Sequence, residues 1–155
     1  KMPKITPKTP AELQKMRESG KILREVLEIL KSRATPGTSL SELDAIAEKS
    51  IRDHDATPAF KGFHGFPSTI CAMLNSEVVH GIPNNRILTP GDLLSVDCGA
   101  IFDGFCSDAA FSLVVGGDAE HPRRAEFSKV VRNALSAGCE VAVAGNFTGD
   151  IGAAI

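Results

Sequence analysis

The sequence has 155 residues, of which 43% are hydrophobic and 23% charged, so it can build one globular domain with a buried core. Its formal net charge of −2 gives no basis for binding nucleic acid or an acidic membrane surface. No apolar run approaches the roughly 18 residues of a membrane span, and the first residues lead into no hydrophobic stretch, so we expect neither a membrane segment nor a secretory signal.

The N-terminal third predicts two helices. Residues 1–8 form a basic, proline-containing arm that we expect to be extended. Thr9-Pro10-Ala11-Glu12 has the features of a helix start: a capping hydroxyl, a proline suited to the first turn and a glutamate that can close a capping box. Apolar spacings of three and four then predict a buried stripe on a helix that runs to about Lys31: Leu13, Met16, Gly20, Leu23, Leu27 and Leu30. A second helix is capped by Ser39 and ends near Asp53.

The middle of the chain combines an aromatic loop with a histidine at a corner. Residues 57–67 place three phenylalanines among glycines and prolines, so we expect no regular element there. The loop fits the wall of an apolar pocket and, equally well, a cover of rings over the edge of the core. Thr69 to Leu74 predicts a strand. His80 precedes a Gly-Ile-Pro corner that would hold its imidazole at a strand end, although a lone histidine is more often structural.

Residues 95–111 predict a β-hairpin. Asp103-Gly104 stands between two apolar runs and suits a type I′ turn, which needs positive φ at both central positions. Phe102 then faces Phe105 across the hairpin. One face carries core-like residues: Val96, Cys98, Ala100, Phe102, Phe105, Ser107, Ala109 and Phe111. The run into the hairpin, 93–96, is apolar on both faces, which indicates a central strand.

Two aspartates share the opposite face of this hairpin. In the predicted register Asp97 and Asp108 form a diagonal pair with Cα atoms roughly 7–8 Å apart. Carboxylates at that spacing can both reach two metal ions about 3.5–4 Å apart. Gly99, directly opposite Asp108, would leave space on this face for an ion. Two solvated aspartates of a one-sided hairpin would give the same pattern, so these residues alone favour neither interpretation.

The C-terminal part predicts a long helix over Pro122–Ala144, ended by Gly145-Asn146. Its expected buried side consists of Phe127, Val130, Val131, Ala134, Leu135 and Val141. Thr148 can cap a further helix, and the sequence stops at Ile155 without a C-cap, as if cut within a domain. The four cysteines lack CxxC spacing, which favours buried free thiols in a reducing cytosol over disulfides or a zinc site.

Three motifs together resemble the type I methionine aminopeptidases of the pita-bread metallopeptidase family: residues 60–67 (FKGFHGFP), residues 75–83 (NSEVVHGIP) and the Asp97/Asp108 hairpin. The resemblance implies an α/β (α+β) pita-bread fold, an antiparallel sheet flanked by helices, of which 1–155 is the N-terminal portion: the first pseudo-symmetric half and the start of the second. It also implies a metalloaminopeptidase that removes N-terminal methionine by means of a water activated by two divalent metal ions (Co, Mn, Fe or Zn).

The resemblance also assigns roles to single residues. Asp97 matches a chelating aspartate, Asp108 a metal-bridging aspartate, and His80 the catalytic imidazole that contacts substrate. The positions that match the methionine pocket are Phe63, His64, Phe66 and Cys71, with His80 beside them. The family often has tyrosine at the two phenylalanine positions, and Cys106 stands where histidine is frequent. The remaining family ligands, one histidine and two glutamates, have no counterpart here, so we expect the 155 residues alone to be incomplete or inactive.

Two other functions compete with this interpretation. An X-Pro peptidase of the same fold is disfavoured by the short N-terminus and by the sequence Val79-His80-Gly81-Ile82-Pro83. A non-catalytic binding module is disfavoured because Asp97, Asp108 and His80 occur together. The implied partners are nascent polypeptides that begin with methionine, in the cytoplasm, with no nucleic acid or membrane. The complete protein is expected to be a monomer, or this chain to pair with a separate C-terminal fragment.

Overall fold

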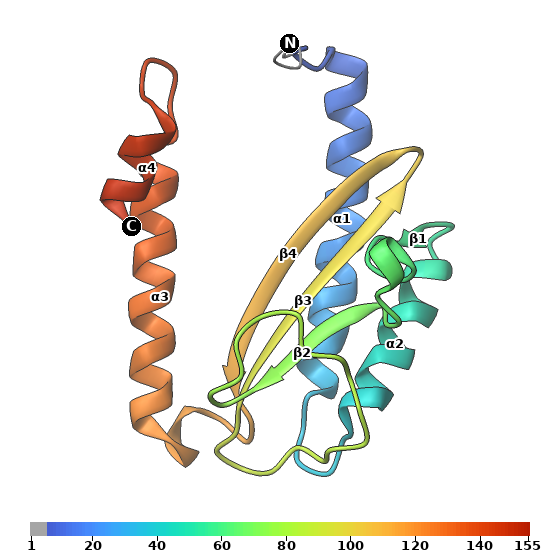
Figure 1. The fold of residues 1–155 in the computed structure, drawn as a ribbon, viewed down its shortest axis with the longest axis vertical. Helices are drawn as coiled ribbons and strands as arrows, with labels where there is room; N and C mark the ends of the chain where they lie inside the picture. The colour runs from blue at the N-terminus through green and yellow to red at the C-terminus, as the bar shows by residue number, and fades with distance from the viewer. Residues whose placement is uncertain (1–5) are drawn as a thin grey trace.

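In the computed structural model, which describes residues 6–155, two helices cover one face of a four-stranded antiparallel sheet, and a pair of helices stands beside it (Figure 1). The helices are α1 (Pro10–Arg33), α2 (Leu40–Arg52), α3 (Pro122–Val141) and α4 (Thr148–Ala154). The strands are β1 (Thr57–Pro58), β2 (Ile70–Leu74), β3 (Leu93–Phe102) and β4 (Phe105–Val114). The predicted α+β class is confirmed. Part of the expected N-terminal arm, 1–5, lies outside the described residues, and 6–8 form no helix or strand.

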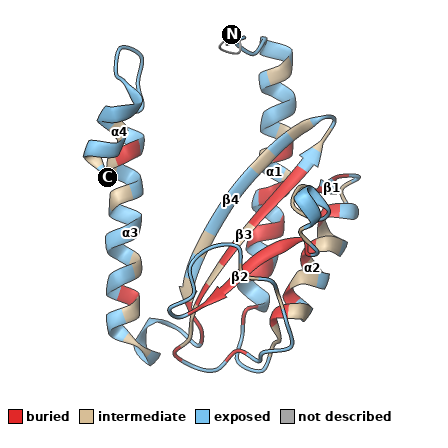
Figure 2. Cartoon of the chain, viewed as in Figure 1, coloured by how far each residue is buried: buried red, intermediate tan, exposed pale blue. Residues whose placement is uncertain are grey.

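Helices α1 and α2 begin at the predicted caps. The Thr9 hydroxyl accepts a hydrogen bond from the Glu12 backbone N–H at 3.3 Å, and the Glu12 carboxylate accepts one from the Thr9 N–H at 2.7 Å, so the capping box is formed. The Ser39 hydroxyl accepts from the N–H of the third residue of α2 at 3.1 Å. The predicted stripe on α1 is wrong at Leu13 and Met16, which are exposed because the first turns of α1 project beyond the core (Figure 2).

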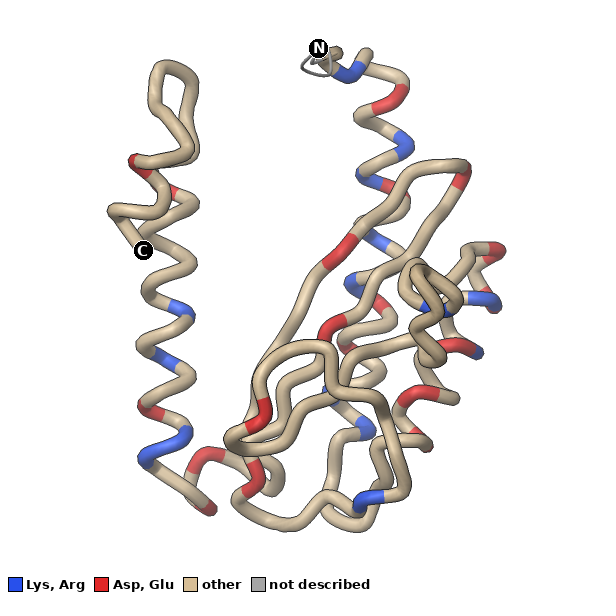
Figure 3. Tube along the Cα trace, viewed as in Figure 1, with Lys and Arg blue, Asp and Glu red and all other residues tan. Residues whose placement is uncertain are grey.

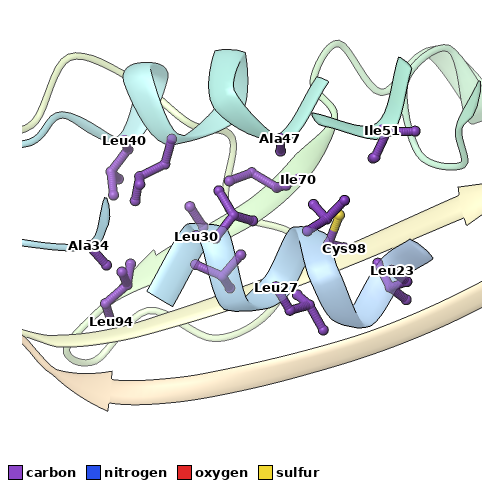
Figure 4. Close-up of a cluster of buried hydrophobic side chains, with 14 of the residues drawn as sticks. Leu23, Leu27, Leu30, Ala34, Leu40, Ala47, Ile51, Ile70, Leu94 and Cys98 are labelled. Atoms are coloured by element: carbon purple, nitrogen blue, oxygen red, sulfur yellow. The ribbon is translucent and has the colours of Figure 1, made fainter. Parts of the chain in front are cut away.

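The core lies between the sheet and these two helices. Figure 4 shows side chains from α1 and α2 packed against β2 and β3, among them Leu30, Leu40 and Ile70, all fully buried. Removing a side chain of this kind costs about 2–5 kcal/mol, so this cluster dominates the stability of the sheet. The buried cluster also holds Cys98 in β3, whose neighbours along the strand therefore point to the opposite face.

The hairpin forms in the predicted register. Asp103 and Gly104 have φ of 47° and 80°, as a type I′ turn requires, and Phe102 pairs with Phe105. Strand β3 is central, with β4 along one edge and β2 and β1 in succession along the other. On the predicted core face of β3, Val96, Cys98 and Ala100 are buried and Phe102 is half-buried. On β4 the same face is half-buried except at Ala109, which is exposed; β4 is the outer strand and has no neighbour beyond it among residues 6–155.

Helix α3 differs most from the sequence prediction. It ends at Val141, three residues before the expected end, and its predicted buried side is open: Phe127, Val130, Val131 and Leu135 are 54–63% exposed. Figure 1 shows the reason, since α3 stands apart from α1 and α2 and crosses neither. Helix α4 packs against the C-terminal part of α3, where Gly138 approaches Ile155 closely. Thr148 is the first residue of α4 and not its cap; the Asp150 carboxylate accepts from the Phe147 N–H instead.

All four cysteines are free, and Cys71 and Cys98 are buried as predicted. The prediction of burial is wrong for Cys106 and Cys139, which are exposed on β4 and α3. Charges of both signs are dispersed along the helices (Figure 3), in keeping with the small net charge. None of the helices described between residues 6 and 155 combines the length and apolarity needed to cross a bilayer.

A histidine links the end of α2 to α1. The His54 ring nitrogens lie 2.8 Å from the carbonyl oxygen of Ser50 and 3.0 Å from the Glu25 carboxylate. Both partners are acceptors, so only the doubly protonated ring can donate to both. The bond to the Ser50 carbonyl first, and then the carboxylate, raise the pKa of His54 above its usual 6.5.

This histidine predicts a pH dependence of stability. Because the folded-state pKa is raised, the stabilisation is fully present below pH 6.5 and is lost as the pH rises through the folded-state value. We expect the free energy of unfolding, measured with urea, to fall between pH 6 and pH 8, and His54→Gln to remove most of that fall. An unchanged slope in the variant would contradict the assignment.

Candidate active site

The two aspartates meet on the open face of the hairpin. Asp97 lies at the middle of β3, opposite Cys71 on β2 and Ala110 on β4, while Asp108 lies opposite Gly99. This is the predicted diagonal arrangement, and it follows from the turn register alone. Asp97 and Asp108 are the only charged residues in β3 and β4 (Figure 3 shows the sparse charge of the hairpin). The hairpin therefore concentrates two negative charges at one point.

This proximity has an electrostatic cost. Burial first, and then the charge of Asp108 and the hydrogen bond shared with it, together raise the pKa of Asp97 to about 6. The backbone N–H of Cys98 and the nearby His80 oppose the shift. A divalent cation would remove the repulsion, and two carboxylates are the oxygen donors that such cations take. The aspartates therefore fit a metal site.

Asp97 and Asp108 supply only part of a metal site. Within residues 6–155, no group of three or more His, Cys, Asp and Glu side chains comes together as a metal-binding cluster. Catalytic metal sites commonly use at least three protein ligands, so two carboxylates form one side of a coordination shell.

The space above Gly99 is not vacant, which corrects the expectation that an ion would occupy it. A Cβ placed on Gly99 would lie 2.8 Å from the ring of Phe60 and 2.9 Å from the Cβ of Ala59. The cause is the pairing of β1 with the end of β3, continued by a hydrogen bond from the Ala59 N–H to the Gly99 carbonyl at 3.0 Å. Gly99 is therefore a site of close approach, and it seats Phe60 on the face that carries both aspartates.

Phe60 was not among the predicted site residues. The signal was present in the sequence as a phenylalanine in the aromatic loop and a glycine on the aspartate face, but their contact depends on β1, a two-residue strand. The expectation that residues 57–67 contain no regular element is also wrong, because this strand and a 3₁₀ turn, Phe63–Gly65, both lie within them. The loop is more ordered than its composition indicates.

The predicted pocket residues differ in how far they are buried. Cys71 is buried and lies directly opposite Asp97 on the neighbouring strand, so the two side chains share a face of the sheet. Burial, and then the charge of Asp97, raise the pKa of the Cys71 thiol to about 11, so the thiol stays neutral. Phe66 is half-buried. Phe63 is 66% exposed and contacts the His64 ring edge-on, with centroids 4.3 Å apart. These two rings are thus not part of the core.

His80 lies on an exposed loop beside β2. The carbonyl of Gly81 accepts a hydrogen bond from the Ala72 N–H at 2.9 Å, next to Cys71, and this places His80 near the aspartate face. Its charge acts on the Asp97 carboxyl. Val79 and His80 both have left-handed backbone, with φ of 42° and 53°, which is rare for a valine. The structure therefore brings Asp97, Asp108, Cys71 and His80 into one neighbourhood.

A groove of about 720 Å³ adjoins these residues. It runs between α3 and the sheet, and its lining includes Leu93, Ser95, Ala110, Phe127, Val131 and Leu135. Ala110 is the cross-strand partner of Asp97, so the groove begins beside the carboxylate pair. The exposed apolar side of α3 forms its far wall.

Comparison with known proteins identifies the family. Residues 14–155 match the profile of metallopeptidase family M24. The methionine aminopeptidase of Clostridium acetobutylicum is 43% identical over 145 residues, covering 93% of this chain and 57% of that protein. Methionine aminopeptidase 1 of Mycobacterium tuberculosis is 43% identical over 154 residues, covering 97% and 56%. The chain thus spans little more than half the length of these relatives.

Solved structures agree. The methionine aminopeptidase of Thermotoga maritima superposes with a TM-score of 0.92 at 31% identity, covering 98% of this chain and 61% of that one. The prolidase of Pyrococcus furiosus, at 22% identity and a TM-score of 0.83, is similar in fold alone. The fold is therefore that of the pita-bread metallopeptidases, and the chain belongs to metallopeptidase family M24.

Proposed function

We propose that the full-length protein to which these 155 residues belong removes the N-terminal methionine from peptides and nascent polypeptides by metal-assisted hydrolysis. The diagonal pair Asp97 and Asp108, with His80 beside it, carries the proposal. The 43% identity to methionine aminopeptidases supports methionine as the side chain recognised. Because proteins are synthesised in the cytoplasm, that is the compartment in which this reaction would occur.

Each residue has a role that its surroundings allow. Asp97 and Asp108 would hold two divalent ions (Co, Mn, Fe or Zn) through their carboxylates. When bound, such ions supply a water of lowered pKa and polarise the scissile carbonyl. His80 is exposed, and its imidazole makes no hydrogen bond within residues 6–155, so it is free to donate to the negative charge that develops on the substrate.

The methionine side chain needs an apolar and polarisable environment. We assign Phe63, His64, Phe66 and Cys71 to this pocket. Cys71 suits the role because it is buried and neutral, and sulfur and aromatic groups contact a thioether favourably. Phe60, seated over Gly99, adds a ring on the same face. An X-Pro peptidase has no observation in its favour beyond the shared fold.

The rest of the metal shell must come from elsewhere. We assign it to a polypeptide segment that corresponds to the part of the relatives beyond this chain, docked in the groove between α3 and the sheet. The apolar side of α3 is open, and the groove begins at the partner of Asp97, so a segment seated there would reach the carboxylates. With that segment in the same polypeptide the enzyme would be a monomer.

A chimera tests the function. This chimera, the completed chain, joins residues 1–155 to the C-terminal segment of the Clostridium acetobutylicum methionine aminopeptidase that lies beyond the matched region. We expect Mn²⁺, Fe²⁺ or Co²⁺ to support release of methionine from Met-Ala-Ser, and EDTA to abolish it. Cleavage of Ala-Pro-Ser instead would favour the X-Pro peptidase, and cleavage of neither peptide would contradict the proposal.

A further inference from the structure

The loop that carries His80 has an unusual backbone conformation, and few buried side chains stabilise it. Residues from Asn75 to His80 are all exposed. Val79 and His80 both have left-handed backbone, which is uncommon for any residue other than glycine and strained for the β-branched Val79. The imidazole has no hydrogen-bond partner within residues 6–155. The position of the ring therefore depends on whatever fixes the backbone on either side of it.

A bidentate ion pair closes the loop. The Arg86 guanidinium donates from Nη1 to Glu77 Oε1 at 2.6 Å and from Nη2 to Glu77 Oε2 at 2.8 Å. The two residues flank the strained segment, one before it and one after it. A parallel pair of bonds of this kind fixes orientation as well as distance, which a lysine or a single contact would not do.

Both ends of this ion pair are attached to the rigid part of the fold. On one side, Glu77 Oε2 also accepts from the Leu74 N–H at 2.9 Å, at the end of β2. On the other, the Arg86 carbonyl accepts from the Leu40 N–H at 3.0 Å, in the first turn of α2. The carboxylate and the guanidinium therefore join β2 to α2 across the mouth of the loop.

A third attachment lies next to the histidine. The Gly81 carbonyl accepts from the Ala72 N–H at 2.9 Å, and a Cβ on Gly81 would overlap the carbonyl oxygen of Ala72. Only glycine can approach β2 this closely. Since Ala72 follows Cys71 on the strand, this contact sets His80 beside the aspartate face whenever the loop is closed.

We propose that Glu77 and Arg86 are positioning residues for His80: their ion pair keeps the loop closed on β2 and so holds the strained Val79-His80 backbone in place for the reaction. The catalytic part of this proposal rests on the proposed function. The pair is exposed, with 42% and 41% of the two side chains accessible, so its effect on global stability is small and its main effect is on the loop.

Amide hydrogen exchange on the 155-residue chain tests the closure without any activity. With Arg86→Gln, we expect the Ala72 N–H, which bonds to Gly81, to exchange about tenfold faster or more. The exchange rate of the Ala59 N–H, which donates to the Gly99 carbonyl from a different loop, should be unchanged. Arg52→Gln is the matched control, because Arg52 makes two bonds to Glu48 on the surface of α2 and should alter neither amide. An unchanged Ala72 amide in Arg86→Gln would overturn the proposal.

A double-mutant cycle in the completed chain tests the route through His80. We expect Arg86→Gln to lower kcat about tenfold with a small change in KM, and to have less than about a twofold effect when His80 is already alanine. Arg86→Lys should recover only part of the loss. An equal loss in both backgrounds would show that Arg86 acts elsewhere. If the completed chain releases no methionine, the proposed function fails, whereas the exchange experiment still decides whether the ion pair closes the loop.

Discussion

We expect Asp108→Asn to lower methionine release by the completed chain by about 10³-fold or more, since loss of a carboxylate proposed to hold the metal ions would remove several kcal/mol of metal-derived stabilisation. Asparagine has nearly the same size but is neutral, so it cannot balance two cations. The residue is exposed on a strand whose register the turn sets, and the fold should persist. Activity is measured as methionine released from Met-Ala-Ser with Mn²⁺ present, together with Mn²⁺ affinity by calorimetry.

Asp103→Asn is the matched control for this substitution. Asp103 belongs to the same hairpin but sits in the turn, where asparagine accepts positive φ equally well. Its ion pair with Lys15 is exposed and contributes little. We expect full activity and unchanged Mn²⁺ affinity in this variant. Full activity in Asp108→Asn would remove the metal assignment, and equal losses in both variants would indicate a damaged hairpin.

The second large effect concerns the open side of α3. Mixed with the separate C-terminal segment of the Clostridium acetobutylicum relative, the 155-residue chain should form a one-to-one complex in analytical ultracentrifugation. Leu135→Glu places a charge in the apolar groove, and we expect it to weaken that complex about 30-fold or more, as for a central interface residue.

Asn133→Glu provides the comparison on the same helix. Asn133 is exposed and lies about half a turn from Leu135, away from the groove, so the added charge should leave the complex unchanged. Equal binding by the Leu135→Glu and wild-type chains would exclude the groove as the docking site. Self-association of the wild-type chain in place of binding would indicate a second copy as its occupant.

The predictable parts of the fold are those with local causes. The Asp103-Gly104 turn sets the pairing of ten residues on each strand, and with it the diagonal position of Asp97 and Asp108. The caps at Thr9 and Ser39 likewise depend on groups three residues away. Such features need no knowledge of the rest of the molecule.

The features that could not be predicted involve distant partners. The periodicity of α3 correctly indicates an apolar side, but whether Leu135 is buried depends on what packs against it. Gly99 looked like an open position because the ring that fills it comes from Phe60, through a strand of two residues. The left-handed backbone of Val79 also has no local signature, and the hydrogen bonds that flank it run to β2 and α2.

The position of the buried cluster along the chain has a consequence for folding during translation. Its members all lie between Leu23 and Val115, so every residue it needs precedes α3 in the chain. As translation proceeds from the N-terminus, this unit can close while α3 is still within the ribosome, and domains commonly fold in that order. Asp97 and Asp108 would then take up their relative positions before the segment proposed to complete the metal site has been made.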